Sequence, residues 1–74
     1  MNELYVLMRD SELVGVYTTH RKATQELILS TQKEGLALRD YSFEFGIEFF
    51  TYVGALPSNL YCWKIHEVTP DNRA

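Results

Sequence analysis

One segment of this 74-residue sequence carries helix signals at both ends, and strand-like patterns surround it. Within residues 18–35, Thr18 or Thr19 can cap the N-terminus by accepting a hydrogen bond from an unpaired backbone N–H. Gly35 can adopt the left-handed conformation that ends a helix, and Leu36 follows it. Because nearly everything outside this segment has strand character, the sequence predicts one helix packed on a sheet.

Four strands are predicted around this helix, at residues 3–9, 13–17, 41–49 and 60–68. The third has the clearest pattern, because its odd positions are apolar and its even positions are polar or small. Gly15, in the middle of the second strand, suggests a bulge or a close backbone approach. We therefore expect an α+β domain of order β-β-α-β-β, with an antiparallel four-stranded sheet and one helix packed on one face.

The expected core lies between the sheet and the helix, with Trp63 and Phe45 facing Leu27. One short helix cannot cover a sheet so rich in aromatic residues, and the first and last strands are apolar on both faces. The second face is closed either by connecting residues, namely Leu36, Leu38 and Leu56, or by another chain. We favour another chain, because exposed apolar patches often mark interaction sites. A two-fold homodimer is the expected form of self-association.

Composition indicates a single folded domain over residues 1–74, with a flexible tail at 69–74. Hydrophobic residues make up 46% of the chain and charged residues 23%, as in globular proteins. The net charge of -3 disfavours binding to nucleic acid or to an anionic membrane. Cys62 has no second cysteine to pair with, and no signal peptide or membrane-spanning run is evident. We expect a cytoplasmic protein.

No residue pattern indicates catalysis, a metal site or a cofactor. Cys62 and His66 lie about 13 Å apart if they share a strand at ~3.3 Å per residue, too far for a nucleophile and its base. Glu44 and Glu48 have the same spacing and are better explained as a solubilising face. Two histidines and one cysteine are too few for a typical zinc site. The sequence therefore predicts a protein that is not an enzyme.

Two surfaces are candidates for binding a partner. The first combines apolar residues with a stripe of carboxylates: Phe50, Tyr52, Leu56, Glu44 and Glu48. Phe50 and Tyr52 fall off the predicted buried face of their strand, and aromatic residues dominate binding hot spots. The carboxylates would select a basic patch on the partner.

The competing surface lies on the helix and consists of His20, Arg21, Lys22 and Leu29. The three basic residues are either solvated or face an acidic group on this protein or another. Leu29 is either an ordinary exposed leucine or a partner contact. This surface would choose an acidic partner or a nucleic acid.

The sequence also has a local resemblance, carried by Tyr5-Val6-Leu7, by the run Leu13-Val14-Gly15-Val16-Tyr17-Thr18-Thr19, and by Ala23. Over about residues 4–30 it resembles small, mostly uncharacterised proteins of bacteriophages and mobile elements. The resemblance implies a small cytosolic protein without a cofactor. Many phage proteins of this size bind a host protein, including those that blunt restriction or CRISPR defences.

We therefore expect a non-enzymatic protein-binding module, encoded by a phage, that inhibits or modulates a protein in the host cytoplasm. The alternative is a nucleic-acid-associated accessory protein, since aromatic residues on a sheet can stack bases. The acidic residues expected on the outer side of the sheet argue against that alternative. A protein partner, host or self, is the expected one.

Overall fold

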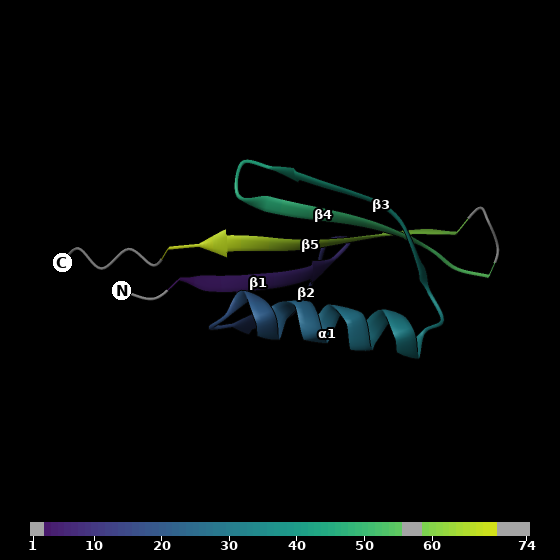
Figure 1. Ribbon diagram of the computed structural model, residues 1–74, viewed down its shortest axis with the longest axis horizontal. Helices are drawn as coiled ribbons and strands as arrows, with labels where there is room; N and C mark the ends of the chain where they lie inside the picture. The colour runs from purple at the N-terminus through teal and green to yellow at the C-terminus, as the bar shows by residue number, and fades with distance from the viewer. Residues whose placement is uncertain (1–2, 56–58, 70–74) are drawn as a thin grey trace.

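The chain folds into a five-stranded antiparallel sheet with one helix on one side (Figure 1). This computed structural model describes residues 3–55 and 59–69. The elements in chain order are β1 (Leu4–Arg9), β2 (Glu12–Tyr17), α1 (His20–Lys33), β3 (Ala37–Glu44), β4 (Ile47–Val53) and β5 (Leu60–Val68). The strand order across the sheet is β2-β1-β5-β4-β3. The expected α+β class with one helix is correct, whereas the expected four-stranded sheet is wrong.

The third predicted strand is in fact a hairpin, which accounts for the extra strand. β3 begins at Ala37, inside the predicted connector, and a two-residue turn at Phe45 and Gly46 joins it to β4. Their φ angles are 53° and 75°, the positive values that a type I′ turn requires. In sequences such turns are usually marked by Asn-Gly or Asp-Gly. Phe45 instead continues the apolar alternation, so the sequence pattern gives no sign of the turn.

This turn also exchanges the two faces of the predicted strand. Glu44 and Ile47 are directly opposite each other and so lie on the same side of the sheet. Along a single strand, residues on one side are separated by an even number of positions, whereas Glu44 and Ile47 are three positions apart. The side facing the helix therefore carries odd-numbered residues in the last half of β3 and even-numbered residues in β4. The helix-facing positions of β4 are therefore Glu48, Phe50 and Tyr52.

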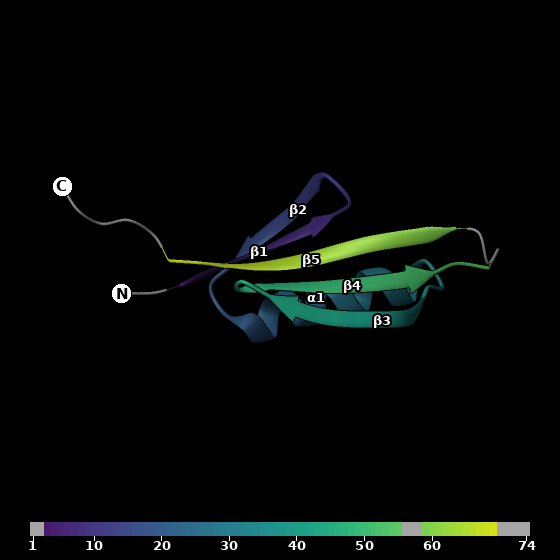
Figure 2. The same ribbon diagram turned by 90° about the horizontal axis from the view of Figure 1, so that it is seen from above.

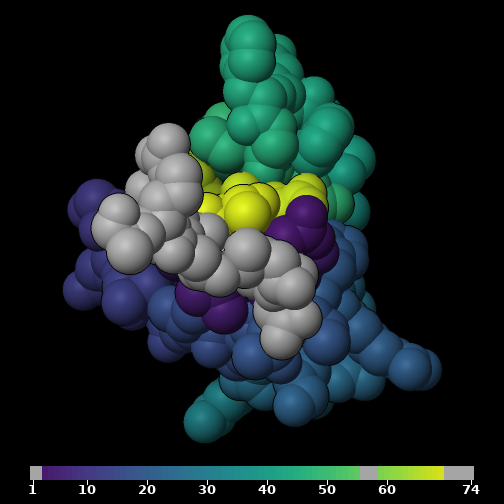
Figure 3. Space-filling model, turned by 90° about the vertical axis from the view of Figure 1, so that its left-hand side faces the viewer, coloured from purple at the N-terminus to yellow at the C-terminus, as the bar shows by residue number. Residues whose placement is uncertain are grey.

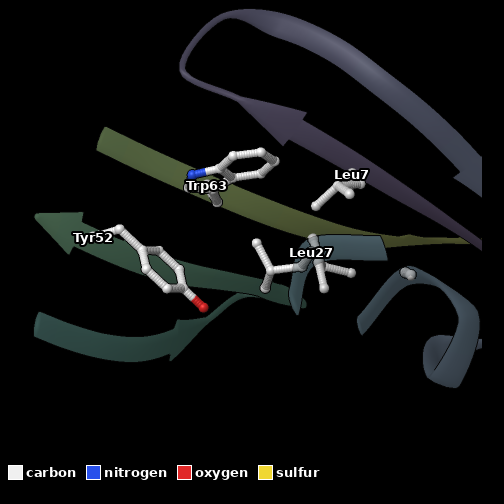
Figure 4. Close-up of a cluster of buried hydrophobic side chains, with 6 residues drawn as sticks. Leu7, Leu27, Tyr52 and Trp63 are labelled. Carbon is white, nitrogen blue, oxygen red and sulfur yellow. The ribbon is translucent and has the colours of Figure 1, made fainter. Parts of the chain in front are cut away.

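The core lies between α1 and the middle of the sheet (Figure 4). Its buried apolar residues are Leu7, Ala23, Leu27, Tyr52, Trp63 and Ile65. In Figure 4, Leu27 of the helix lies between Leu7 and Trp63 on one side and Tyr52 on the other. The predicted contact region of Trp63 and Leu27 is confirmed. Phe45 is 97% exposed, so its predicted place in the core is wrong.

Local hydrogen bonds fix both ends of the helix. The Thr19 side chain accepts from the Lys22 backbone N–H at 3.1 Å, which is N-capping geometry. At the other end Gly35 has φ 70°, and the Leu36 N–H donates to the Thr31 carbonyl at 2.8 Å. This is the Schellman arrangement, in which a left-handed glycine lets the chain satisfy the last carbonyls. The predicted start and end of the helix are confirmed.

Gly15 occupies an irregular part of β2. The pairing with β1 shifts register between Leu7 and Met8, where Gly15 is the partner of Leu7. A Cβ atom on Gly15 would collide with the ring of Tyr17, which folds back over the glycine. The expected bulge is confirmed by the register shift, whereas the close approach to Gly15 is made by the Tyr17 side chain and not by backbone.

Arg9 ties the end of the helix to the sheet. Its two terminal nitrogens donate to the two carboxylate oxygens of Glu34, each at 2.7 Å. The guanidinium carbon lies 5.2 Å from the ring centre of Tyr61 and 5.4 Å from that of Trp63. Arg9 therefore covers the aromatic end of the core and contributes cation–π contacts as well as an ion pair.

Candidate functional surfaces

The aromatic residues of the first predicted surface belong to the core layer. Tyr52 is 7% exposed, and Phe50 packs against the buried cluster. Phe50 is paired with Trp63 and Tyr52 with Tyr61 across β4 and β5, so both face the helix. The prediction that these two side chains face outward is wrong, because the turn at Phe45 and Gly46 reverses which side of the predicted strand faces the helix. Leu56 lies outside the described residues.

The two carboxylates of that surface have different surroundings. Glu48 is engaged within the molecule: its Oε1 is 2.5 Å from His20 Nε2, and its Oε2 accepts from the Tyr41 hydroxyl at 2.7 Å. The hydrogen bond to Glu48, with smaller contributions from desolvation and charge, raises the pKa of Tyr41. Glu44 is exposed at the end of β3. Only Glu44 therefore remains a solvent-facing carboxylate of the predicted stripe.

The second predicted surface is divided between two sides of the helix. His20 turns towards the sheet and pairs with Glu48. Glu48 is therefore an acidic group of the kind predicted opposite the basic residues of the first helical turn. Arg21 and Lys22 are exposed, and Leu29 is 59% exposed on the side of the helix away from the core. A hollow on this outer side is lined by Gln25, Glu26, Ile28 and Leu29. The four predicted residues do not form one patch.

The side of the sheet away from α1, here called the open sheet face, is largely apolar. Strand register places on it Leu4, Val6, Met8, Leu13, Val16, Ile47, Phe49, Val53, Leu60, Cys62 and Val68. In Figure 1 the helix lies on one side of the sheet, and no other described element covers the opposite side. Leu13, on β2, is 62% exposed, and Leu60, on β5, is 51% exposed.

The polar residues of the open sheet face have a simple arrangement. Lys64 and His66 lie on β5, the middle strand, and Lys64 is paired with Met8 on one side and Phe49 on the other. Asp40, Ser42 and Glu44 lie on β3, at one edge of the sheet, and Thr51 lies on β4. The face thus has one lysine at its centre and carboxylates along one side. The sequence had indicated that the first and last strands are apolar on both faces, and pairing places them side by side.

Phe45 stands at the tip of the β3–β4 hairpin, whose green end projects from the body of the molecule in Figure 3. The backbone of the turn is anchored, since the Glu67 N–H donates to the Gly46 carbonyl at 3.1 Å. A left-handed φ costs an ordinary L-residue roughly 1–2 kcal/mol. Asp10, which also has a positive φ (54°), gains a hydrogen bond in return, because its Oδ1 accepts from the Cys62 N–H at 3.3 Å. The exposed phenyl group of Phe45 offers no comparable compensation.

Carboxylates gather at the same end of the molecule as this tip. Glu3 raises the pKa of Glu67, by hydrogen bonding and then by its charge. The Tyr5 hydroxyl donates to Glu3 at 3.2 Å, and the pKa of Tyr5 is raised by desolvation and then by Glu3. Together with the exposed Glu44, these groups give the end of the sheet that carries the tip an acidic character.

Within residues 3–55 and 59–69, no cluster of three or more His, Cys, Asp or Glu side chains is arranged to hold a metal ion. The helix of the described chain is neither long nor apolar enough to cross a membrane. No protein-family model, curated protein or solved structure matches this chain. The two features that stand out are therefore physical ones, the open sheet face and the Phe45 tip.

Proposed function

We propose that this protein is a small non-enzymatic protein-binding module that inserts the tip of its β3–β4 hairpin into a pocket of another protein. The supporting observation is Phe45, a large apolar side chain that is 97% exposed on a left-handed backbone. The left-handed backbone lowers the stability of the isolated fold, and the exposed phenyl group contributes little packing to it. Residues held in disfavoured conformations concentrate at functional sites, and buried aromatic anchors provide much of the energy of protein interfaces.

The surroundings of the tip define the partner's chemistry. Glu44 adjoins Phe45 in the chain, and Glu67 hydrogen-bonds to the turn through its backbone. A complementary site is therefore an apolar pocket with a basic rim, since opposite charges speed encounter and reject wrong partners. These carboxylates, with the net charge of -3, disfavour nucleic acid as the occupant. The resemblance to phage proteins favours a host protein, bound in the host cytoplasm and inhibited or modulated there.

A photo-crosslinking experiment tests this proposal. Benzoylphenylalanine replaces Phe45 in one variant and Leu29 in the control, because Leu29 is also exposed but lies on the outer side of the helix. In lysate from the encoding organism or its host, position 45 should crosslink to one protein at a site rich in apolar and basic residues. Unlabelled wild-type protein should compete for this adduct, and the Phe45→Asn variant should compete at least about 30-fold less well, as expected for a hot spot worth ~2 kcal/mol.

The competition supplies the decisive comparison. Equal crosslinking from positions 45 and 29 would show that adducts form by random collision. Equal competition by wild type and Phe45→Asn would show that the phenyl group does not bind the partner. Either result would contradict the proposed role of the tip.

A further inference from the structure

We infer that the open sheet face is covered by a second copy of this chain, giving a two-fold dimer with its sheets face to face and its helices outside. This inference concerns a different surface from the Phe45 tip. It starts from the apolar residues of this face, which are exposed or half-buried and lie next to one another across paired strands. Val16 on β2 and Val68 on β5, for example, are 51% and 43% exposed, and β1 lies between their strands.

The small core gives a reason for this face to be covered. The described chain buries six apolar residues, all in the layer between sheet and helix. On the other side, β1, β4 and β5 contribute apolar residues to a face that meets no second layer. Stable domains bury both apolar faces of a sheet that is apolar on both sides. A second sheet packed at ~10 Å would supply the missing layer.

The size of the face favours a second copy over a single helix. Five strands spaced by ~4.8 Å and about six residues long give a footprint roughly 20 Å on each side, or about 400 Å². A helix with its side chains is about 10–12 Å wide and would leave nearly half of this face exposed. An identical sheet matches it in both dimensions. Two faces, with the added relief of their side chains, approach the roughly 1,000 Å² expected of a specific interface.

Such an area lies at the low end for stable complexes, so we expect association in the micromolar range. In a two-fold interface the same patch is used on both subunits. Lys64, at the middle of the middle strand, then lies close to the symmetry axis and to its counterpart. Its flexible stem can carry the ammonium group towards the edge, where Asp40 and Glu44 lie on β3. The central lysine therefore weakens the dimer but does not prevent it.

The inference is tested by sedimentation equilibrium of the full chain between about 1 and 200 µM. The wild type should change from 8.6 kDa towards twice that mass over this range. Val16→Lys introduces a charge on the open sheet face and should remain monomeric throughout. Leu29→Lys is the matched control, since it adds the same charge at a similarly exposed position on the outer side of the helix. It should dimerise like the wild type.

Lys64→Met is the second variant, and it keeps the inference testable if Val16→Lys does not fold. It removes the charge and keeps an unbranched apolar stem, so the dimer should become at least about tenfold tighter. Far-ultraviolet circular dichroism establishes that each variant is folded. A wild type that stays at 8.6 kDa up to 200 µM would overturn the inference. So would a dimer that tolerates Val16→Lys, or one that Lys64→Met weakens, because self-association would then use another surface or need the lysine.

The outcome is separable from that of the proposed function. Phe45→Asn should leave the dimerisation constant unchanged, since the tip is not part of the open sheet face. A monomeric protein that still crosslinks through position 45 would contradict only the dimer. A dimer with no specific adduct at position 45 would contradict only the proposed role of the tip.

Discussion

Replacing Phe45 by asparagine should make the isolated protein more stable, although it removes a large apolar side chain. Phe45 has φ 53° and is 97% exposed, so its ring contributes little packing to the fold. The left-handed conformation costs an ordinary residue roughly 1–2 kcal/mol, and asparagine avoids much of this cost. Asparagine before glycine is also the preferred sequence for a type I′ turn, which Gly46 already completes. We expect a gain of about 0.5–1.5 kcal/mol in the free energy of unfolding.

Urea unfolding and thermal melting at one fixed protein concentration measure this gain. A change of 1 kcal/mol in a domain of this size corresponds to a shift of roughly 4–8 °C in Tm. Phe45→Ala is the control, because it removes the ring but leaves an ordinary residue at positive φ, and it should change stability little. Gly46→Ala should lose about 1 kcal/mol, since Gly46 has φ 75°. A loss of stability in Phe45→Asn, or an equal gain in Phe45→Ala, would refute the reasoning from backbone strain.

Three further changes test the core, the helix attachment and the charge cluster. Trp63→Ala should cost about 3–5 kcal/mol in urea unfolding, because Trp63 is 1% exposed in the core; a small cost would show that the core tolerates its absence. Glu34→Gln should weaken the pair with Arg9 and leave the guanidinium over the aromatic rings, and the partial exposure of the pair limits the cost to about 0.5–1 kcal/mol; a loss above 2 kcal/mol would give the pair a larger role. Glu67 has a raised pKa in the folded protein, so its ionisation should lower stability as the pH rises from about 4 to 7. Glu67→Gln should remove that part of the pH dependence and be more stable than wild type at pH 7; an unchanged profile would show that Glu3 does not oppose ionisation of Glu67.

The helix and three of the strands could be predicted because their signals are local. The helix ends at Thr19 and Gly35 are fixed by hydrogen bonds between residues no more than five positions apart. The interior position of β1 followed from apolar residues on both of its faces, and the sheet order confirms it. Trp63 and Leu27 were placed correctly for the same reason, since each lies in an element whose extent had been predicted.

The errors in assigning side chains to the faces of the third predicted strand begin at the turn of Phe45 and Gly46. A two-residue turn separates residues on the same side of a sheet by three positions, so missing it reverses the assignment of every later side chain in the strand. For that reason Phe50 and Tyr52 were expected on a surface and lie instead against the core. Glu48 was expected among solvent-facing acids and instead pairs with His20, which is 28 residues away in the sequence.

The sequence by itself determined which segments become helix or strand and that more apolar surface exists than one helix can cover. These properties depend on backbone preferences and composition, which act within a few residues. Only the tertiary structure decided which side of each strand is buried, because that depends on register between strands distant in the chain. It also assembled the open sheet face from β1, β2, β4 and β5 and left Phe45 at an exposed tip. In Figure 2 the β1–β2 hairpin diverges from β3 and β4 as the sheet twists, a relation fixed by pairing across the sheet and not by any one segment.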